Sequence, residues 1–346
     1  MLYIETDHEI LMQLCETQRC IKTEFTVASW NITADFFDKK EEEYQIHNWN
    51  NRQPSVLKTL KNLNNDIIGL QELSPNQAVI ISEIKEYQSL FLSQTPSDIE
   101  PGLIVDGLGV KDWINKNIGT PLIGLLFKPD IYDIIQQGRF WLKEDPDSLP
   151  IYKDRSLTDK GFGNMNTYRA VLWIKLKHKS TKKILFVFNS HYPLSGGPST
   201  RLKCAEIERQ KINEIAKDDL WISMGDRNII FELGVLTKIG DLDAMKPLLY
   251  NAFDAVNSNH KGPMTTWAGF KYDKCTNIIT NGEFEYPVRL DIIISNIQAI
   301  SSHHIITQFD ENEIILNPLK LEEKRQFASD HLIVVAFFEF YTKMFD

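Results

Sequence analysis

Short apolar segments that end in a polar residue recur along this chain, and this pattern constrains the fold more than any other feature. Residues 66–72 form an isoleucine-containing apolar run that ends at Glu72, and its length predicts a buried strand. Residues 168–176 and 184–190 are also strand-like, and the polar connection between them suits a hairpin. Apolar residues at helical spacing over 52–64 predict a helix before the first of these strands. Hairpin-like neighbours mixed with helices favour two packed mixed sheets flanked by helices over a doubly wound parallel sheet.

The remaining elements follow from the same two periodicities. We predict further strands where β-branched and aromatic residues are concentrated, at 25–31, 122–127, 131–136, 220–224, 289–295 and 331–341. Helical spacing predicts helices at 8–20, 75–87 and 199–217. Segments with many breaker residues are predicted to be loops, at 91–120, 144–166 and 307–328. No internal repeat or linker is visible, so residues 1–22 are interpreted as an N-terminal extension and residues 23–346 as a single domain.

The charge balance limits the kinds of partner. The chain has 38 basic and 47 acidic residues, and its net charge is −9. This argues against a protein that coats nucleic acid through a broad basic surface, because neutralising many phosphates needs clustered lysine and arginine. It does not exclude a compact site that holds a single phosphate with a metal cation and a few basic residues.

Cysteine content and hydropathy limit the cellular locations that we expect for the protein. Cys15, Cys20, Cys204 and Cys275 lack the spacing of a structural zinc site and are too few for a disulfide-stapled scaffold, so free thiols are expected. The first residues are acidic early and contain no uninterrupted apolar run, unlike a signal peptide. No stretch is long and apolar enough to span a bilayer. The chain is therefore predicted to be soluble, and either cytoplasmic or exported without a cleaved signal.

Polar residues that could carry chemistry lie at the ends of several predicted strands or just inside them: Asn31, Glu72, Asn189, His191, Asp226, Asn228, Asp291, Asp330 and His331. Taken singly, most have an ordinary explanation, since an aspartate after a strand is usually a turn or capping residue. Asp291 is harder to explain in that way, because a carboxylate inside an apolar strand is costly unless it is paired. Together these residues supply carboxylates for a hard divalent cation, a base for water and donors for phosphoryl charge.

In their order along the chain, the motifs resemble the endonuclease/exonuclease/phosphatase superfamily. This DNase I-like group includes abasic-site endonucleases, neutral sphingomyelinases, inositol-polyphosphate 5-phosphatases and deadenylases. The resemblance runs from Thr26 to Phe340 and rests on six motifs: Trp30-Asn31, Gln71-Glu72, Asn189-Ser190-His191, Gly225-Asp226-Arg227-Asn228, Arg289-Leu290-Asp291 and Ser329-Asp330-His331. Residues 49–52, 138–142 and 145–147 are similar to one bacterial branch with no assigned substrate, and Thr265-Thr266-Trp267 to the deadenylase-like branch. The resemblance implies a four-layer αββα sandwich.

The resemblance also implies Mg²⁺ or Mn²⁺ as the cofactor. Glu72 would be the principal metal ligand, with Asn31 and Asp330 nearby. Asp226 would activate or orient the attacking water. Asn228 would fix the Asp226 carboxylate and contact the phosphate.

The same comparison assigns the groups that stabilise charge. His191 and His331 would stabilise the negative charge that develops on the phosphate, and Asp291 would orient His331. Arg169 could bind a phosphate through two hydrogen bonds, although an arginine at a sheet edge is also ordinary. Arg227 stands where the superfamily usually has an apolar or aromatic residue. A side chain directed to solvent or to a neighbouring carboxylate is favoured there over an extra phosphate contact.

Two further observations narrow the hypotheses. The Cys-Asp-Arg signature of inositol 5-phosphatases is absent, and residues 287–291 read Pro-Val-Arg-Leu-Asp instead, which disfavours a phosphoinositide enzyme. His303 and His304 lie outside every motif and are interpreted as surface residues rather than as a metal site.

We therefore expect a divalent-metal-dependent phosphoester hydrolase, most simply a phosphodiesterase or nuclease that uses in-line attack by water. A lipid or small-molecule phosphatase, similar to sphingomyelinases, is the second hypothesis, and a catalytically silent binding protein on the same fold is the third. The catalytic residues would serve any phosphoester, whether nucleic acid, nucleotide or lipid headgroup. Specificity should therefore come from loops at 91–120, 142–166 and 305–328. No obligate protein partner is evident from the sequence, and a monomer is expected.

Overall fold

The computed structural model describes twelve stretches of the chain: residues 20–38, 47–94, 104–106, 122–149, 152–153, 156–157, 169–228, 253–254, 259–262, 265–267, 289–305 and 328–343. The helix expected at 8–20 falls almost wholly outside these described residues, as do most of the loops expected at 91–120 and 307–328. The expected domain boundary at residue 22 lies within the first described strand, which begins at Cys20.

The first sheet has eight strands. Its spatial order is β13 (His260–Lys261), β15 (Ser301–Ile305), β16 (Ile333–Lys343), β1 (Cys20–Asn31), β2 (Ile67–Leu73), β5 (Leu122–Phe127), β3 (Gln88–Ser93) and β4 (Ile104–Asp106). β1 pairs antiparallel with β16 and parallel with β2. The carboxyl ends of β1 and β2 therefore meet at one edge of the sheet, beside the beginning of β16.

The second sheet has six strands, in the order β12 (Phe253–Asp254), β14 (Asp291–Ser295), β11 (Leu220–Asp226), β10 (Ile184–His191), β9 (Ala170–His178) and β6 (Tyr132–Trp141). β10 and β11 are parallel, and β9 and β10 form the expected antiparallel pair. β6 continues to Trp141, beyond the strand expected at 131–136. A separate two-stranded sheet joins β7 (Tyr152–Lys153) to β8 (Ser156–Leu157).

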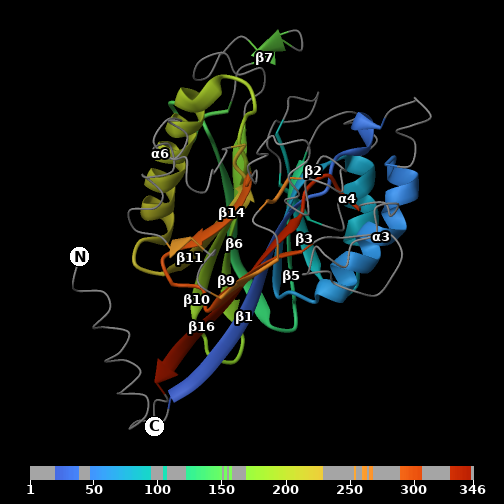
Figure 1. Cartoon of the computed structure of the whole chain (residues 1–346). Coiled ribbons are helices and arrows are strands. Elements are labelled where there is room, and N and C mark those ends of the chain that lie inside the picture. Colours follow the sequence, from blue (N-terminus) through green and yellow to red (C-terminus); the bar gives the residue numbers. More distant parts are fainter. Residues whose placement is uncertain are drawn as a thin grey trace, which may run out of the picture.

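Helices cover the outer faces of the two sheets (Figure 1). α3 (Trp49–Leu63) and α4 (Pro75–Ser82) lie against the first sheet, and α6 (Gly197–Ala216) lies against the second. A short 3₁₀ helix, η1 (Asp35–Phe37), follows β1. The layers are thus helix, sheet, sheet and helix, which confirms the expected αββα sandwich. None of the described helices is long and apolar enough to cross a membrane.

α4 begins and ends for local reasons. The side chain of Ser74 accepts a hydrogen bond from the Gln77 amide while the Gln77 side chain accepts one from Ser74, so the first turn is capped in both directions. The helix stops at Ser82, earlier than expected, and Tyr87 then places its hydroxyl on the carbonyl of Asn65 at 2.9 Å. That contact anchors the chain as it enters β3.

Alternating side chains divide the core into two clusters. Phe25 and Val27 of β1 pack between the two sheets, whereas Ala28 and Trp30 pack toward α3 and α4. Because successive residues of a strand point to opposite faces, a strand buried on both faces is apolar at consecutive positions. This explains the uninterrupted apolar runs in the sequence.

The sheets approach each other closely beneath the polar motifs. A Cβ atom built on Gly69 would lie 2.4 Å from the sulfur of Met224 in the opposite sheet, so a larger residue there would have to displace the Met224 side chain. Asn189 of β10 donates to the carbonyls of Leu70 (3.0 Å) and Gly124 (2.7 Å) and accepts from Gln71 (2.8 Å). Asn189 therefore links the second sheet to the first directly below the motif residues.

Candidate active site

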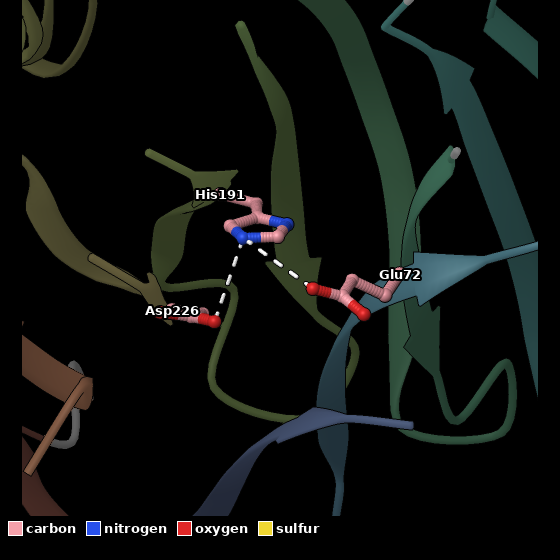
Figure 2. Close-up of side chains that lie close together, drawn as sticks. All are labelled: Glu72, His191 and Asp226. Atoms are coloured by element: carbon pink, nitrogen blue, oxygen red, sulfur yellow. Dashed lines mark ion pairs between the residues drawn. The ribbon is translucent and has the colours of Figure 1, made fainter. Parts of the chain in front are cut away.

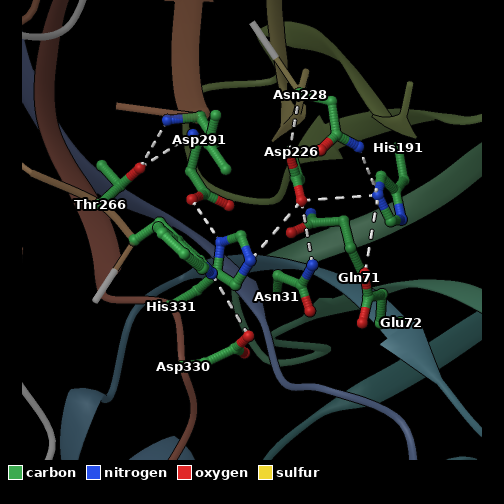
Figure 3. Close-up of polar contacts among 12 residues, drawn as sticks. Asn31, Gln71, Glu72, His191, Asp226, Asn228, Thr266, Asp291, Asp330 and His331 are labelled. Carbon is green, nitrogen blue, oxygen red and sulfur yellow. Dashed lines mark hydrogen bonds and ion pairs between the residues drawn. The ribbon is translucent and has the colours of Figure 1, made fainter. Parts of the chain in front are cut away.

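The motif residues converge where the two sheets end (Figure 3). Asn31 and Glu72 come from the carboxyl ends of the parallel strands β1 and β2, and His191 and Asp226 from those of β10 and β11. Asp291 begins β14 on the other side of β11, while Asp330 and His331 precede β16. Each sheet contributes part of the site, so its geometry depends on how the sheets dock.

Glu72 is placed by an irregularity in β2. The pairing of β2 with β5 shifts register between Leu70 and Leu73, and the backbone of Glu72 has φ 52°, in the left-handed region. Such bulges re-aim side chains, and a left-handed backbone at a non-glycine residue is a strained arrangement that functional sites often retain. The Glu72 carboxylate, which is 22% exposed, lies 3.8 Å from Nε2 of His191 (Figure 2). Burial and the nearby charge of Asp330 raise the pKa of Glu72.

Asp226 is held by the turn that follows β11. Gly225 has φ 144°, and a Cβ there would lie 1.8 Å from the carbonyl oxygen of Ser190, so the motif requires glycine at this position. Oδ1 of Asp226 accepts from the backbone amide of Asn228 at 2.8 Å, and Oδ2 accepts from the side chain of Asn31 at 3.0 Å. Burial and the adjacent Asp291 carboxylate raise the pKa of Asp226 to about 7.

His191 is oriented from behind by Arg169, whose Nη1 lies 3.2 Å from His191 Nδ1. A guanidinium can only donate, and so can the side-chain nitrogen of Asn228, which lies 3.0 Å from Nε2. A neutral ring accepts from one of these two donors and carries its proton on the other ring nitrogen. Nε2 lies 3.4 Å from Asp226 Oδ2, on the same side as Glu72. Burial and the positive charge of Arg169 lower the pKa of His191 well below its usual value. His191 is therefore a neutral ring whose Nε2 faces two carboxylates.

His331 has the opposite electrostatic character. Its Nδ1 lies 2.8 Å from Oδ2 of Asp291, and its Nε2 faces Asp226 at 3.8 Å. Burial opposes the charged ring, but the carboxylates of Asp291, Asp330 and Asp226 outweigh burial and raise the pKa of His331 well above its usual value. Asp291 is fixed in turn by Thr266, whose hydroxyl accepts from the backbone amide of Asp291 at 3.0 Å.

Asp330 and Asn31 border the carboxylates. Asp330 accepts hydrogen bonds from the hydroxyl of Thr33 and, at 3.4 Å, from Nε1 of Trp267. The side-chain nitrogen of Asn31 donates to Asp226, and its carbonyl oxygen accepts from the backbone amide of Thr33 at 3.0 Å. Asn228, with φ 51°, places its side-chain nitrogen 3.0 Å from Nε2 of His191. All eight residues expected to act as catalytic groups or metal ligands thus lie together.

Arg169 lies in the site, whereas Arg227 does not. Arg227 is fully buried on the opposite face of β11, where its guanidinium contacts both carboxylate oxygens of Glu208 at 2.7 and 2.9 Å. A phosphate contact by Arg227 is therefore wrong, because the side chain turns away from the site and pairs with a buried carboxylate. The favoured alternative, a neighbouring carboxylate, is the one observed. The interpretation of His304 as a surface residue is also wrong, since His304 is fully buried and its ring stacks edge-on against His260.

Several residues that support the site were not foreseen. Arg52 is fully buried and donates to the carbonyls of Ile32, Thr33 and Ala328, so it ties the segment after β1 to the segment before Asp330. Thr33 and Thr266 hold Asp330 and Asp291 in comparable ways. The similarity of residues 49–52 and 265–267 to known branches singled out two of these segments, but it gave no role for Arg52 or Thr266.

The donor chemistry of the site suits a hard divalent cation. Among the described residues, two groups bring three possible ligand atoms within 4.8 Å of one another, namely Glu72 with His191 and Asp226, and Asp226 with Asp291 and His331. The raised pKa values of Glu72 and Asp226 indicate carboxylates with too little positive charge around them. Oδ1 of Asp291 also accepts no hydrogen bond from any described residue. Oxygen-rich, negatively charged sites of this kind fit Mg²⁺ or Mn²⁺.

Comparison with known sequences gives a limited result. No protein-family model matches the chain. A curated relative, the uncharacterized protein R895 of Acanthamoeba polyphaga mimivirus, is 28% identical over 330 residues, which cover 90% of this chain and 46% of that protein. The chain thus spans about half the length of the relative it matches.

Comparison with solved structures establishes the fold. An endonuclease/exonuclease/phosphatase family protein from Bacteroides thetaiotaomicron has a TM-score of 0.66 at 19% identity, covering 92% of this chain and 96% of that one. The mannosyl-6-phosphatase Bt3783 of the same species has a TM-score of 0.65 at 19% identity, covering 90% and 98%. D. rerio TDP2, solved with a single-strand DNA product, has a TM-score of 0.53 at 14% identity, covering 93% and 100%. The chain therefore has the DNase I-like fold of the endonuclease/exonuclease/phosphatase superfamily.

Proposed function

We propose that this chain is a phosphoester hydrolase that depends on Mg²⁺ or Mn²⁺ and is most simply a phosphodiesterase. One observation carries the proposal: a neutral histidine, a charged histidine and crowded carboxylates face one another at the end of two sheets. His191 and His331 both direct Nε2 at Oδ2 of Asp226, at 3.4 and 3.8 Å. A structural cluster would balance its charges, whereas this one leaves carboxylates with raised pKa values.

Glu72 would be the principal ligand of the cation, with Asn31 and Asp330 beside it. When bound, the cation would neutralise phosphoryl oxygens and so lower the barrier to attack. The bulged backbone of Glu72 supports this role, because it projects a partly exposed carboxylate toward the opposite sheet. The charge of Asp330 acts on Glu72, so both carboxylates lie where one cation would relieve their repulsion.

Asp226 would orient the attacking water and take its proton. Its Oδ1 is held by the backbone amide of Asn228 and its Oδ2 by Asn31, so the carboxylate has a fixed direction. As the water oxygen attacks phosphorus, the ester P–O bond on the opposite side breaks, and the leaving oxygen departs with the electron pair. A base in a fixed geometry contributes about 10²- to 10⁴-fold to such a step.

The two histidines would stabilise charge on the phosphoryl oxygens. The protonated His331 can donate from Nε2, because Asp291 occupies its Nδ1. His191 can donate from Nε2 while neutral in the tautomer whose Nδ1 accepts from Arg169. Arg169 also has an Nε–H group with no hydrogen-bond acceptor among the described residues, which suits a further contact with an anionic substrate.

The likeness to solved structures and the net charge favour two substrate classes. A phosphodiester such as single-stranded nucleic acid is our first candidate, in keeping with the likeness to TDP2, which was solved with a single-strand DNA product. A sugar or small-molecule phosphomonoester is the second, because the mannosyl-6-phosphatase matches with the higher TM-score, 0.65 against 0.53. The net charge of −9 makes long duplex DNA the less suitable nucleic acid.

A panel of substrates tests the proposal. The protein would be assayed on an aryl phosphodiester, an aryl phosphomonoester, single-stranded RNA and DNA, sugar phosphates and sphingomyelin, with Mg²⁺, with Mn²⁺ and with chelator. We expect hydrolysis that chelator abolishes and that Asp226→Ala reduces at least about 100-fold. Asp133→Asn is the matched control, since Asp133 is an exposed carboxylate paired only loosely with Lys179 at 3.5 Å. Hydrolysis that survives chelator, or that persists in Asp226→Ala, would contradict the proposal.

A further inference from the structure

A second buried polar cluster lies behind the active site, between β10, β11 and α6. It consists of five fully buried residues, Ser190, Tyr192, Glu208, Ser223 and Arg227, and is called the Glu208 cluster below. Glu208 is the member that α6 contributes. The other four come from β10, β11 and the residues that directly follow these strands.

One carboxylate holds the cluster together. Oε2 of Glu208 accepts from Ser190 Oγ (3.1 Å), Tyr192 Oη (2.8 Å) and Arg227 Nη1 (2.7 Å). Oε1 accepts from Ser223 Oγ and from Arg227 Nη2 (2.9 Å). The guanidinium also lies over the Tyr192 ring, 4.7 Å from its centroid. The pair is thus bidentate and directional, which fixes angles as well as distances.

The cluster reaches the residues next to the catalytic ones. Ser190 and Tyr192 bracket His191, and Arg227 follows Asp226. Because side chains alternate along a strand, His191 and Asp226 face the site while their neighbours face α6. The backbone amide of Tyr192 also donates to the carbonyl of Asp226 at 2.9 Å. Any shift of Arg227 or Tyr192 is therefore transmitted to the Nε2–Oδ2 contact of His191 and Asp226, which measures 3.4 Å.

Stability alone does not account for a charged pair at this position. Apolar residues of similar volume pack such positions at least as stably as a buried ion pair does, and often more stably. The ion pair instead fixes a direction. Apolar packing allows a strand end to slide or rotate, whereas five hydrogen bonds to one carboxylate prevent such movement. The benefit is therefore expected in the alignment of the site rather than in the free energy of unfolding.

We propose that Glu208 and Arg227 are positioning residues that fix His191 relative to Asp226 for hydrolysis. The role rests on the proposed function above. Neither residue touches the site of reaction; both act through the strand ends that carry it. Displacements of about 1 Å at a reacting group cost on the order of 100-fold in rate, so a loosened strand end should lower kcat about 10- to 100-fold with little change in KM.

The test compares single and double variants. Glu208→Gln and Arg227→Met each leave a partner buried without its counter-charge and should lower both Tm and kcat. The double variant Glu208→Leu/Arg227→Met removes both charges but leaves the buried hydroxyls of Ser190, Tyr192 and Ser223 without their acceptor. We therefore expect it to regain part of the lost Tm but not kcat. Lys211→Met is the matched control: Lys211 lies one turn further along α6 and pairs outward with Asp147 at 2.9 Å. A double variant that regains both Tm and kcat would overturn the positioning role.

A second measurement does not require that the protein hydrolyse a substrate. Protein labelled with ¹⁵N-histidine would report the tautomer of His191, whose signals are assigned with His191→Gln. We expect distinct protonated and unprotonated ring nitrogens in the parent and the control, and averaged signals in the double variant. Unchanged His191 signals in the double variant would also overturn the role. If the parent hydrolyses no substrate, the proposed function fails while this measurement still decides whether the cluster positions His191.

Discussion

Two buried polar clusters lie back to back on β10 and β11, and they differ in how charge is balanced. Behind the strands, Glu208 accepts five hydrogen bonds and faces the guanidinium of Arg227. In front, Asp226 shares its surroundings with other carboxylates, and its pKa is raised to about 7 by burial and by Asp291. The same two strands therefore carry one neutralised cluster and one that is left electronegative.

The contrast in charge balance distinguishes a cluster that only supports the fold from one suited to chemistry. Arg227 departs from the superfamily pattern and drew attention as a possible ligand, yet its charge is fully compensated. Asp226 sits in an ordinary turn, yet burial and neighbouring carboxylates disfavour its charged form. Residual electrostatic imbalance, rather than the presence of charged residues, marks the site.

The largest expected effect comes from neutralising the electronegative cluster. Asp226→Asn should lower kcat by about 10³-fold, because the amide cannot take a proton from water. The same change should raise the Tm of the metal-free protein, because it removes a repelled carboxylate. Steady-state kinetics and thermal unfolding would be measured beside Asp133→Asn. A large loss of Tm would show that Asp226 is instead a structural residue.

Breaking the Glu208–Arg227 ion pair should lower the stability of the protein, in contrast to Asp226→Asn, which should raise it. Glu208→Gln leaves the Arg227 guanidinium buried without a carboxylate, and it should lower the free energy of unfolding by about 3–5 kcal/mol. Urea denaturation measures this change, with Lys211→Met as the control, since Lys211 pairs with the exposed carboxylate of Asp147. A loss below about 1 kcal/mol would mean that water or another group compensates Arg227.

Cation binding at the electronegative cluster should raise the free energy of unfolding by an intermediate amount, and the Glu208 cluster should not contribute to this rise. At a cation concentration 100 times its Kd, the free energy of unfolding should rise by about 2.7 kcal/mol. The rise should disappear in Glu72→Gln, which removes the principal proposed ligand, and should remain in Lys211→Met. Thermal unfolding titrated with Mn²⁺ and Mg²⁺ provides the measurement. Equal stabilisation of Glu72→Gln and the parent would place the cation elsewhere.

The last effect concerns pH in the metal-free protein, and it is spread over about three pH units. The pKa of Asp226 rises from 3.8 to about 7 on folding, so the unfolded chain loses this proton first and gains stability relative to the native state. Stability should therefore fall as pH rises from about 4 to about 7, by at most about 1.4 kcal/mol for each pH unit from this group. Denaturation at several pH values should show a flatter profile for Asp226→Asn. An identical slope in both proteins would contradict the raised pKa.

The sequence alone predicted the layers, and it predicted eight polar residues that the structure brings together at one end of the two sheets. Apolar runs that are buried on both faces have a clear signature, and the order of the motifs placed their polar ends at one edge. The pairing of Asp291 with His331 could be anticipated as well, because a carboxylate inside an apolar strand needs a partner.

The supporting contacts could not be anticipated, for a physical reason. Arg52 binds the carbonyl of Ala328, 276 positions away, and nothing local to either residue encodes that contact. The partner of Arg227 is Glu208, on a helix whose rotation about its axis decides which side chains face the sheet. The bulge at Glu72 is a register shift between β2 and β5, and it arises only when the two strands pair.

The central pairing of β1 with β16 joins the beginning of the described chain to its end, with Cys20 opposite Lys343. Loop closure over such a separation is slow and comes late in folding. Asp330 and His331 stand directly before β16, so the candidate site cannot form until the chain has been synthesised through β16. Truncated chains that lack β16 would leave the long edge of β1 open to pairing with other molecules. The topology thus links assembly of the candidate site to the synthesis of β16.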